Sequence, residues 1–189
     1  VSLKPEEVER LLASCDLRKR VGRRDRAVLV MLARLGLRAG EVAGLTLDDI
    51  DWSSAEITIR GKGTRCHRFP LPCDVGEALV VYLRSARPRC RTRRVFVRYR
   101  APFRPFIFGS AVIGGIVARA LERAGLRPPQ RGAHLLRHTA ARQMLRGGAS
   151  LGEIGEVLRH RQPDTTTIYA KVDLTTLRSV APPWLKGGR

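Results

Sequence analysis

Residues 134–140 read His-Leu-Leu-Arg-His-Thr-Ala and lie in a stretch, residues 133–146, whose apolar spacing predicts a helix. His134, Arg137 and His138 stand at positions i, i+3 and i+4, so their side chains project from one face of that helix. A guanidinium can hold two phosphate oxygens at once, and an imidazole can donate or accept a proton. The stretch therefore predicts a phosphate site, with a structural histidine pair as the competing interpretation.

Two further groups follow this helix along the chain. His160 stands at the end of the next predicted helix, and Tyr169 follows in another helical segment. A phenol can attack phosphorus and leave a covalent ester, but with a pKa near 10 it needs a base or nearby cations. Taken alone, Tyr169 would be interpreted as a packing tyrosine; only the combination of groups predicts phosphodiester cleavage without a metal.

Earlier in the chain, Arg38 lies between Gly36 and Gly40, where one predicted helix ends and another begins. Flanking glycines let the backbone and the guanidinium approach a ligand closely. Glu41, three residues on, can hold Arg38 in one rotamer, although a structural ion pair explains the same spacing. Lys62 stands between two glycines at the tip of a predicted hairpin, where an ammonium can reach a groove and protonate a leaving oxygen.

The composition points to a polyanionic partner. The chain has 189 residues, which suits one domain, and carries a net charge of +19 with a pI near 11.4. Such a positive excess favours nucleic acid. An anionic membrane is the alternative, yet no apolar run approaches the roughly 20 residues needed to span a bilayer. No stretch resembles a secretory signal.

The four cysteines, Cys15, Cys66, Cys73 and Cys90, are unevenly spaced and include no Cys-x-x-Cys pair. Neither a zinc cage nor a disulfide framework is predicted, and a reduced cytosolic compartment is the simplest inference. A metal site at Cys66, His67 and Cys73 is disfavoured because these residues follow an alternating strand pattern with no fourth ligand nearby.

The pattern along the chain predicts an α+β fold, mostly helical with one small sheet. A basic linker is expected over residues 18–26, and a β-hairpin over residues 55–71 around the Gly-Lys-Gly turn. A further helix should carry Tyr169. The other predicted helices cover residues 2–12, 27–35, 40–45, 74–85, 110–124, 133–146 and 151–158.

Residues 87–104 form the clearest predicted loop, because prolines and many arginines crowd together there. A solvated surface loop and a phosphate-contacting strip explain this charge density about equally well. The candidate DNA-binding residues in this loop are Arg87, Arg89, Arg91, Arg93, Arg94, Arg98 and Arg100.

The combined pattern matches a known family. The order Arg38, Lys62, His134-x-x-Arg137, His160 and Tyr169 resembles the catalytic domain of tyrosine recombinases, also called phage-type integrases. The resemblance covers nearly the whole chain and is most specific over residues 134–140 and 158–173. It implies a mostly α-helical catalytic fold with a small antiparallel hairpin sheet at one edge.

The resemblance implies a role for each residue of the set. Tyr169 would attack the phosphodiester to form a 3′-phosphotyrosyl bond and free a 5′-hydroxyl. Arg38 and Arg137 would hold the non-bridging oxygens, and Lys62 would protonate the leaving 5′ oxygen. Positioned positive charge lowers most of the barrier in phosphoryl transfer, so no metal or other cofactor is expected.

The same resemblance assigns supporting roles. His134 and His160 would assist proton movement and brace the phosphate, while Glu41 would support Arg38 and His138 would support the site. One departure from the family pattern is Arg159, which stands where the family usually has a helix-ending glycine before the second histidine.

By this resemblance, residues 1–173 are the catalytic domain, and residues 174–189 are a carboxy-terminal tail with a possible protomer-docking helix at 174–180. The family's amino-terminal core-binding domain is absent from this chain, which suggests a fragment or a minimal protein. The expected partner is double-stranded DNA, bound by a homotetramer on paired sites that is a monomer without DNA. We expect a cytoplasmic, nucleoid-associated protein with no membrane partner.

Two alternatives to a recombinase stay open at this point. A type IB topoisomerase uses similar chemistry and would relax supercoils without choosing a sequence, although the carboxy-terminal motifs here look more like those of recombinases. A DNA-binding module that has lost its chemistry would bind DNA with strong salt dependence yet form no covalent bond.

Overall fold

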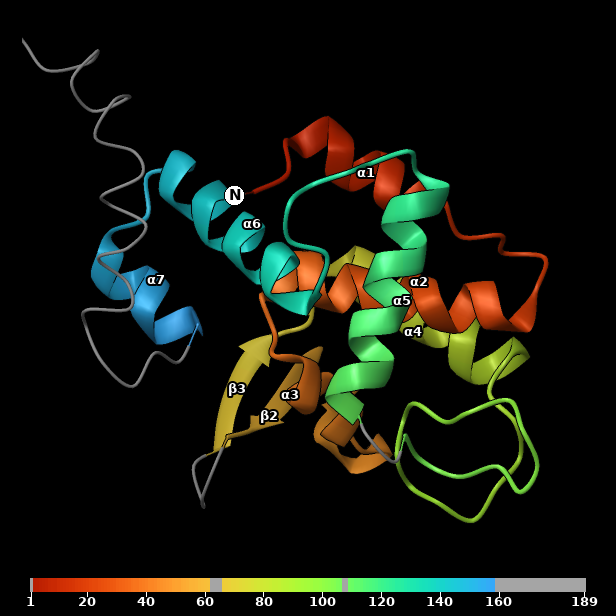
Figure 1. Ribbon diagram of the computed structural model, residues 1–189. Helices are drawn as coiled ribbons and strands as arrows, with labels where there is room; N and C mark the ends of the chain where they lie inside the picture. Colours follow the sequence, from red (N-terminus) through yellow and green to blue (C-terminus); the bar gives the residue numbers. More distant parts are fainter. Residues whose placement is uncertain (1, 62–65, 107–108, 159–189) are drawn as a thin grey trace, which may run out of the picture. The chain divides into compact units, whose positions relative to one another are not determined.

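The computed structural model describes residues 2–61, 66–106 and 109–158. By its internal contacts the chain divides into two compact units, residues 1–140 and 141–189. The described residues form seven α-helices, one 3-10 turn and three short strands (Figure 1). This confirms the predicted class, mostly helical with a small antiparallel sheet. No helix in these three ranges is long and apolar enough to cross a bilayer.

The elements follow one another closely along the chain, and most lie where the sequence predicts them. The helices are α1 (Pro5–Ala13), α2 (Arg20–Leu35), α3 (Ala39–Gly44), α4 (Cys73–Ser85), α5 (Gly109–Arg123), α6 (Ala133–Arg146) and α7 (Leu151–Leu158). The strands are β1 (Ile50–Asp51), β2 (Glu56–Arg60) and β3 (Cys66–Pro70), preceded by the 3-10 turn η1 (Leu47–Asp49).

The start of α2 differs from the prediction. The expected linker over residues 18–26 is wrong, because the helix already begins at Arg20. Arg24 and Asp25 are both buried and paired, with Nη2 of Arg24 2.7 Å from Oδ1 of Asp25. The Arg24 guanidinium also lies 5.1 Å from the ring centre of Tyr99. A cation that is paired with a carboxylate and packed on an aromatic ring can be buried. The basic residues from Arg20 onward can therefore be part of a helix that packs on the core.

The predicted hairpin is confirmed. β2 pairs antiparallel with β3, with Ile59 opposite His67 and Arg60 opposite Cys66. β1 adds a third strand on the other side of β2, giving the order β1-β2-β3. The sequence did not indicate β1, because two residues are too few to show an alternating pattern.

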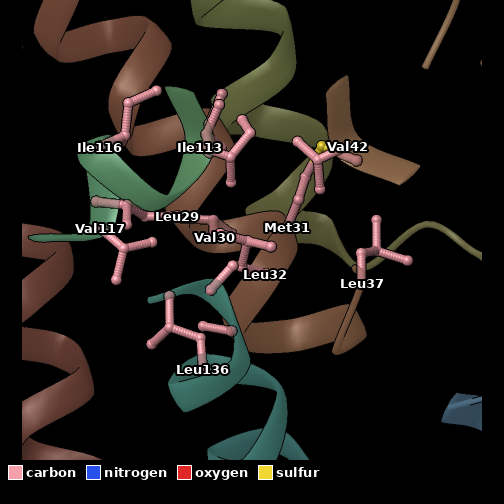
Figure 2. Close-up of a cluster of buried hydrophobic side chains, with 14 of the residues drawn as sticks. Leu29, Val30, Met31, Leu32, Leu37, Val42, Ile113, Ile116, Val117 and Leu136 are labelled. Atoms are coloured by element: carbon pink, nitrogen blue, oxygen red, sulfur yellow. The ribbon is translucent and has the colours of Figure 1, made fainter. Parts of the chain in front are cut away.

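The core of the first unit forms around α2, with α5 and the start of α6 packed against it. Figure 2 shows the buried side chains of this cluster, including Leu29, Val30, Met31, Leu32, Ile113, Ile116 and Val117. Leu37 and Leu136 are fully buried in the same cluster and precede Arg38 and Arg137 in the chain. The apolar core therefore fixes the backbone next to both arginines.

A close crossing of α3 and α5 depends on a glycine. A Cβ added at Gly109 would lie 2.4 Å from the Cβ of Ala43, which is too close for any side chain. Glycine at this position lets the two backbones approach each other. Because Arg38 directly precedes α3, this crossing helps to set where Arg38 lies.

Residues 87–104, which we call the arginine loop, are mostly irregular as predicted. Their backbone is bonded to the segment where η1 begins: Leu47 N–H donates to the carbonyl of Arg93 at 2.8 Å, and Val95 N–H donates to that of Leu45 at 2.9 Å. Backbone hydrogen bonds hold this loop on the domain, which a charge pattern alone does not reveal.

In the second unit, α7 begins with a reciprocal cap. Ser150 N–H donates to Oε2 of Glu153 at 2.7 Å, and Glu153 N–H donates to Oγ of Ser150 at 3.3 Å. This capping box satisfies two backbone donors at the start of the helix. Ile154 and Leu158 are buried in a small cluster with Ala141.

Candidate active site

Arg38 lies at the start of α3, in the short turn that follows α2. Its backbone N–H donates to Oε2 of Glu41 at 2.7 Å, and its Nη1 donates to Oε1 of the same carboxylate at 3.0 Å. The Glu41 side chain is 8% exposed, whereas that of Arg38 is 41% exposed. Glu41 thus holds the backbone and the guanidinium of Arg38 together, while part of the Arg38 side chain is exposed to solvent.

Arg137 meets the same turn from α6. Its Nη1 donates to the backbone carbonyl of Gly36 at 2.6 Å, and the whole residue is only 5% exposed. Gly36 ends α2 in the left-handed conformation, with φ 58° and ψ 28°. The turn from Gly36 to Glu41 therefore anchors both predicted phosphate-binding arginines. The sequence indicated Gly36 as a helix end beside Arg38, but no local pattern showed that its carbonyl accepts a hydrogen bond from Arg137.

The two histidines of α6 differ in exposure. His134 is exposed, His138 is half-buried, and Arg137 between them is buried. The three side chains of the predicted shared face therefore differ in their exposure to solvent. His134, in the first turn of α6, is the more accessible imidazole for a ligand.

Three members of the predicted set, Lys62, His160 and Tyr169, lie outside the described residues. The structure brings Arg38, Glu41 and Arg137 together at one turn, with His134 and His138 on the helix that carries Arg137.

An ion pair anchors the end of β2. Nε of Arg60 donates to Oδ1 of Asp49 at 2.8 Å, and Thr46 donates its N–H and its hydroxyl to Oδ2 at 2.8 and 2.6 Å. Burial raises the pKa of Asp49, but the donated hydrogen bonds outweigh burial and hold this pKa below its ordinary value. Asp49 is therefore ionised, and it holds the side chain of Arg60, the last residue of β2, in place.

A cavity of about 270 Å³ between α3 and β2 borders this pair. Its charged lining consists of Glu41, Asp49, Arg60 and Arg94. Glu41 is bonded to Arg38, and Asp49 to Arg60. The two carboxylates and two arginines of the lining balance, so the cavity has no clear preference for an anion or a cation.

The seven arginines predicted to bind DNA divide into two groups. Arg87 donates three hydrogen bonds to carbonyl oxygens of the arginine loop itself, at 2.7, 2.9 and 3.1 Å. Arg93 pairs with Asp48, and Arg94 donates to the carbonyl of Gly44. These three side chains hold the loop in shape, a role that the sequence did not indicate.

The other four arginines of the loop are differently placed. Arg98 is half-buried, and its Nε has no hydrogen-bond partner among the described residues. Arg89, Arg91 and Arg100 are exposed, and within the described part of the chain they form no ion pair and no side-chain hydrogen bond. These last three guanidinium groups are available to a partner.

The cysteines are free thiols, of which Cys66 and Cys73 are exposed and Cys15 is buried. Burial raises the pKa of the Cys15 thiol. Over residues 2–61, 66–106 and 109–158, no group of three or more His, Cys, Asp or Glu side chains is placed to hold a metal ion.

Comparison with known proteins agrees with this fold, which is that of tyrosine recombinase catalytic domains. The chain belongs to the phage integrase family, whose family model matches residues 2–175.

Three similar proteins illustrate the relationship. Over 179 residues the chain is 55% identical to y4rA of Sinorhizobium fredii, which bears the name integrase/recombinase, and the match covers 95% of this chain and 43% of y4rA. It is 37% identical to tyrosine recombinase XerC 2 of Ralstonia nicotianae, over 94% of this chain and 51% of that protein. A crystal structure of the XerH site-specific recombinase bound to palindromic difH substrate, a post-cleavage complex, matches with a TM-score of 0.80 and 26% identity, over 98% of this chain and 54% of XerH.

The chain spans about half the length of these three proteins.

Proposed function

We propose that this chain carries the strand-cleaving centre of a site-specific DNA recombinase or integrase, which cuts and rejoins DNA through a 3′-phosphotyrosyl intermediate. The observation that supports it most is the anchoring of Arg38 and Arg137 to one turn. Two guanidinium groups held by one short segment can bind the non-bridging oxygens of a single phosphate. Their charge is in place before the reaction, which is the condition for electrostatic stabilisation of a phosphoryl transition state.

The tyrosines favour Tyr169 as the nucleophile. The chain has three tyrosines. Tyr82 is fully buried, its hydroxyl donates to a backbone carbonyl at 3.2 Å, and burial raises its pKa. The Tyr99 hydroxyl lies 2.9 and 3.0 Å from two backbone carbonyls, and burial also raises its pKa. Since bonded phenols with raised pKa values are poor nucleophiles, Tyr169 is the candidate that remains.

The proposed step is an exchange of one phosphate ester for another. The Tyr169 hydroxyl gives its proton to an imidazole of the site, and its oxygen bonds to phosphorus as the bond to the 5′ oxygen breaks. Lys62 gives the departing oxygen a proton. His134 and His160 assist proton movement and brace the phosphate. Rejoining reverses these steps with a 5′-hydroxyl as the attacking group, so no external energy source is required.

Double-stranded DNA is the proposed partner, with four copies of the protein acting on paired sites and the free protein a monomer. XerH, which shares this fold, was crystallised bound to its difH substrate. The net charge of +19 supports a polyanionic partner independently of that likeness.

The test is covalent capture. The protein is incubated with a pool of nicked duplexes of randomised sequence, and adducts that survive denaturant are isolated and sequenced. We expect adducts enriched in one sequence, which Tyr169→Phe abolishes while DNA binding persists. Tyr82→Phe is the matched control, since it removes a phenol hydroxyl elsewhere and should leave the adduct in place.

Other outcomes separate the alternatives. Adducts without sequence enrichment, together with relaxation of arbitrary plasmid DNA, would instead support a topoisomerase. Binding without any adduct would refute the enzyme and leave a DNA-binding module.

A further inference from the structure

The start of α2 is rich in cationic side chains, and one of them, Arg20, has no stabilising role in the helix. Arg18 and Lys19 pair with Asp16, at 3.0 and 3.6 Å. Arg20 is exposed, and its guanidinium forms no ion pair and no hydrogen bond with the described residues. The first turn of α2 contains no acidic residue. A cation at the start of a helix opposes the helix dipole, so Arg20 does not contribute favourably to the stability of α2.

The arginine loop lies directly beside this helix start. The Tyr99 hydroxyl is 3.0 Å from the carbonyl of Arg20 and 2.9 Å from that of Ala86. Arg23 of α2 also donates to the carbonyl of Ser85 at 3.3 Å. These contacts place the start of α2, the end of α4 and the arginine loop side by side (Figure 1). Segments far apart in sequence thus contribute to one basic region.

We propose that the exposed arginines of this region form one phosphate-binding surface for duplex DNA, away from the turn that holds the two anchored arginines. We call it the distal arginine surface and define it as Arg20, Arg89, Arg91 and Arg100. All four are exposed, and none forms an ion pair in the described part of the chain. Guanidinium groups that form no ion pair within the protein can bind phosphate oxygens.

The length of α2 sets how far the Arg20 end of the surface lies from Arg38. The helix has 16 residues, and at 1.5 Å per residue it spans about 24 Å. Arg20 opens the helix, and Arg38 follows its end by three residues. At 3.4 Å per base pair, 24 Å corresponds to about seven base pairs of DNA. The distal arginine surface would therefore contact phosphates on the flank of a cleavage point; this spacing rests on the proposed function, whereas the surface itself does not.

Salt dependence of DNA binding tests the surface. The variant R20Q/R89Q/R100Q is compared with R10Q/R119Q/R127Q, which removes the same charge from exposed positions on α1, on α5 and just after α5. Dissociation constants for a long duplex of arbitrary sequence are measured at several salt concentrations. Each lost phosphate contact reduces the slope of log affinity against log salt by about 0.9. We expect the first variant to lose about 2.7 from the slope and the control to change little.

Two measurements keep the result interpretable. Thermal unfolding should show that Arg20→Gln leaves Tm unchanged or raises it, because a cation is removed from a helix start. Arg100→Gln alone should reduce the slope by about 0.9.

An equal reduction of the slope in both triple variants would refute the proposed surface, because only net charge would then matter. A slope unchanged in both would overturn the DNA assignment in favour of an acidic protein partner. If DNA binding shows the expected dependence on salt but no adduct forms, the proposed function is refuted, whereas the distal arginine surface is still supported.

Discussion

Gly36→Ala tests whether the end of α2 positions Arg137. Gly36 has φ 58° and ψ 28°, a conformation that residues with a Cβ adopt only at a cost. Its carbonyl accepts the 2.6 Å hydrogen bond from the buried guanidinium of Arg137. Alanine therefore either keeps this backbone under strain or relieves the strain by turning the carbonyl away.

The two responses have different magnitudes. Strain alone should lower the free energy of unfolding by about 1–2 kcal/mol. Turning the carbonyl weakens a hydrogen bond to a charged group, which is worth about 1.5–3 kcal/mol. If that energy orients Arg137 for the transition state, its loss slows strand cleavage by about ten- to a hundredfold.

Gly125→Ala provides the matched control. Gly125 follows α5 with φ 66°, and an added Cβ there would meet no atom within 4 Å. It carries the same kind of strain but contacts neither arginine of the candidate site. Denaturant unfolding measures the stability of both variants, and single-turnover adduct formation on nicked DNA measures cleavage.

We expect both variants to lose similar stability and only Gly36→Ala to cleave slowly. If the two variants cleave at the same rate while both are folded, the Gly36 carbonyl does not position Arg137. The site would then depend on Arg137 and its other neighbours alone.

Three further experiments test a helix crossing, an ion pair and the burial of a thiol. Gly109→Ala should lower the free energy of unfolding by about 1–3 kcal/mol, because the added methyl group clashes with α3. Gly114→Ala lies in the same helix, where an added Cβ meets open space, and should raise the free energy of unfolding by about 0.5–1 kcal/mol. Urea unfolding measures both variants, and equal effects would contradict the close crossing of α3 and α5. Asp49→Asn should lower Tm at pH 7 and make Tm fall less steeply in acid. The reason is that a carboxyl whose folded pKa lies below the ordinary 3.8 stabilises the fold fully above about pH 5 and loses that contribution as the pH drops through the folded pKa. If Tm depends on pH in the same way in the variant and in the unchanged protein, Asp49 does not have this role. A thiol reagent should label exposed Cys66 in the native protein and buried Cys15 only on unfolding, as mass spectrometry of the peptides can show; rapid native labelling of Cys15 would contradict its burial.

Local sequence patterns predicted most helices well. The bounds of α6 and α7 agree with the predicted ranges 133–146 and 151–158. Both segments show apolar residues at helical spacing, and that periodicity depends only on neighbours along the chain. The paired strands β2 and β3 were also predicted, because an alternating pattern on each side of a glycine turn is a local signal.

Predictions from the sequence were wrong or incomplete for arginines whose partners the folded chain brings near. The segment over residues 18–26 resembled a linker because it is densely basic, yet Arg24 is buried against Asp25 and the ring of Tyr99. Likewise, Arg87 and Arg93 of the arginine loop hold the loop in shape through carbonyl oxygens and an ion pair. Each partner is supplied by packing, so no local pattern distinguishes these arginines from exposed ones.

The sequence alone determined which chemical groups the site can contain and in what order, because residue type fixes the chemistry of a side chain. It predicted Arg38 and Arg137 as phosphate-binding groups, but it could not show that both meet at one turn. Arg137 and Gly36 are 101 positions apart, and their contact exists because Leu37 and Leu136 are buried in one core. Packing of that core, which sums many weak contacts between distant segments, decided the geometry of the site.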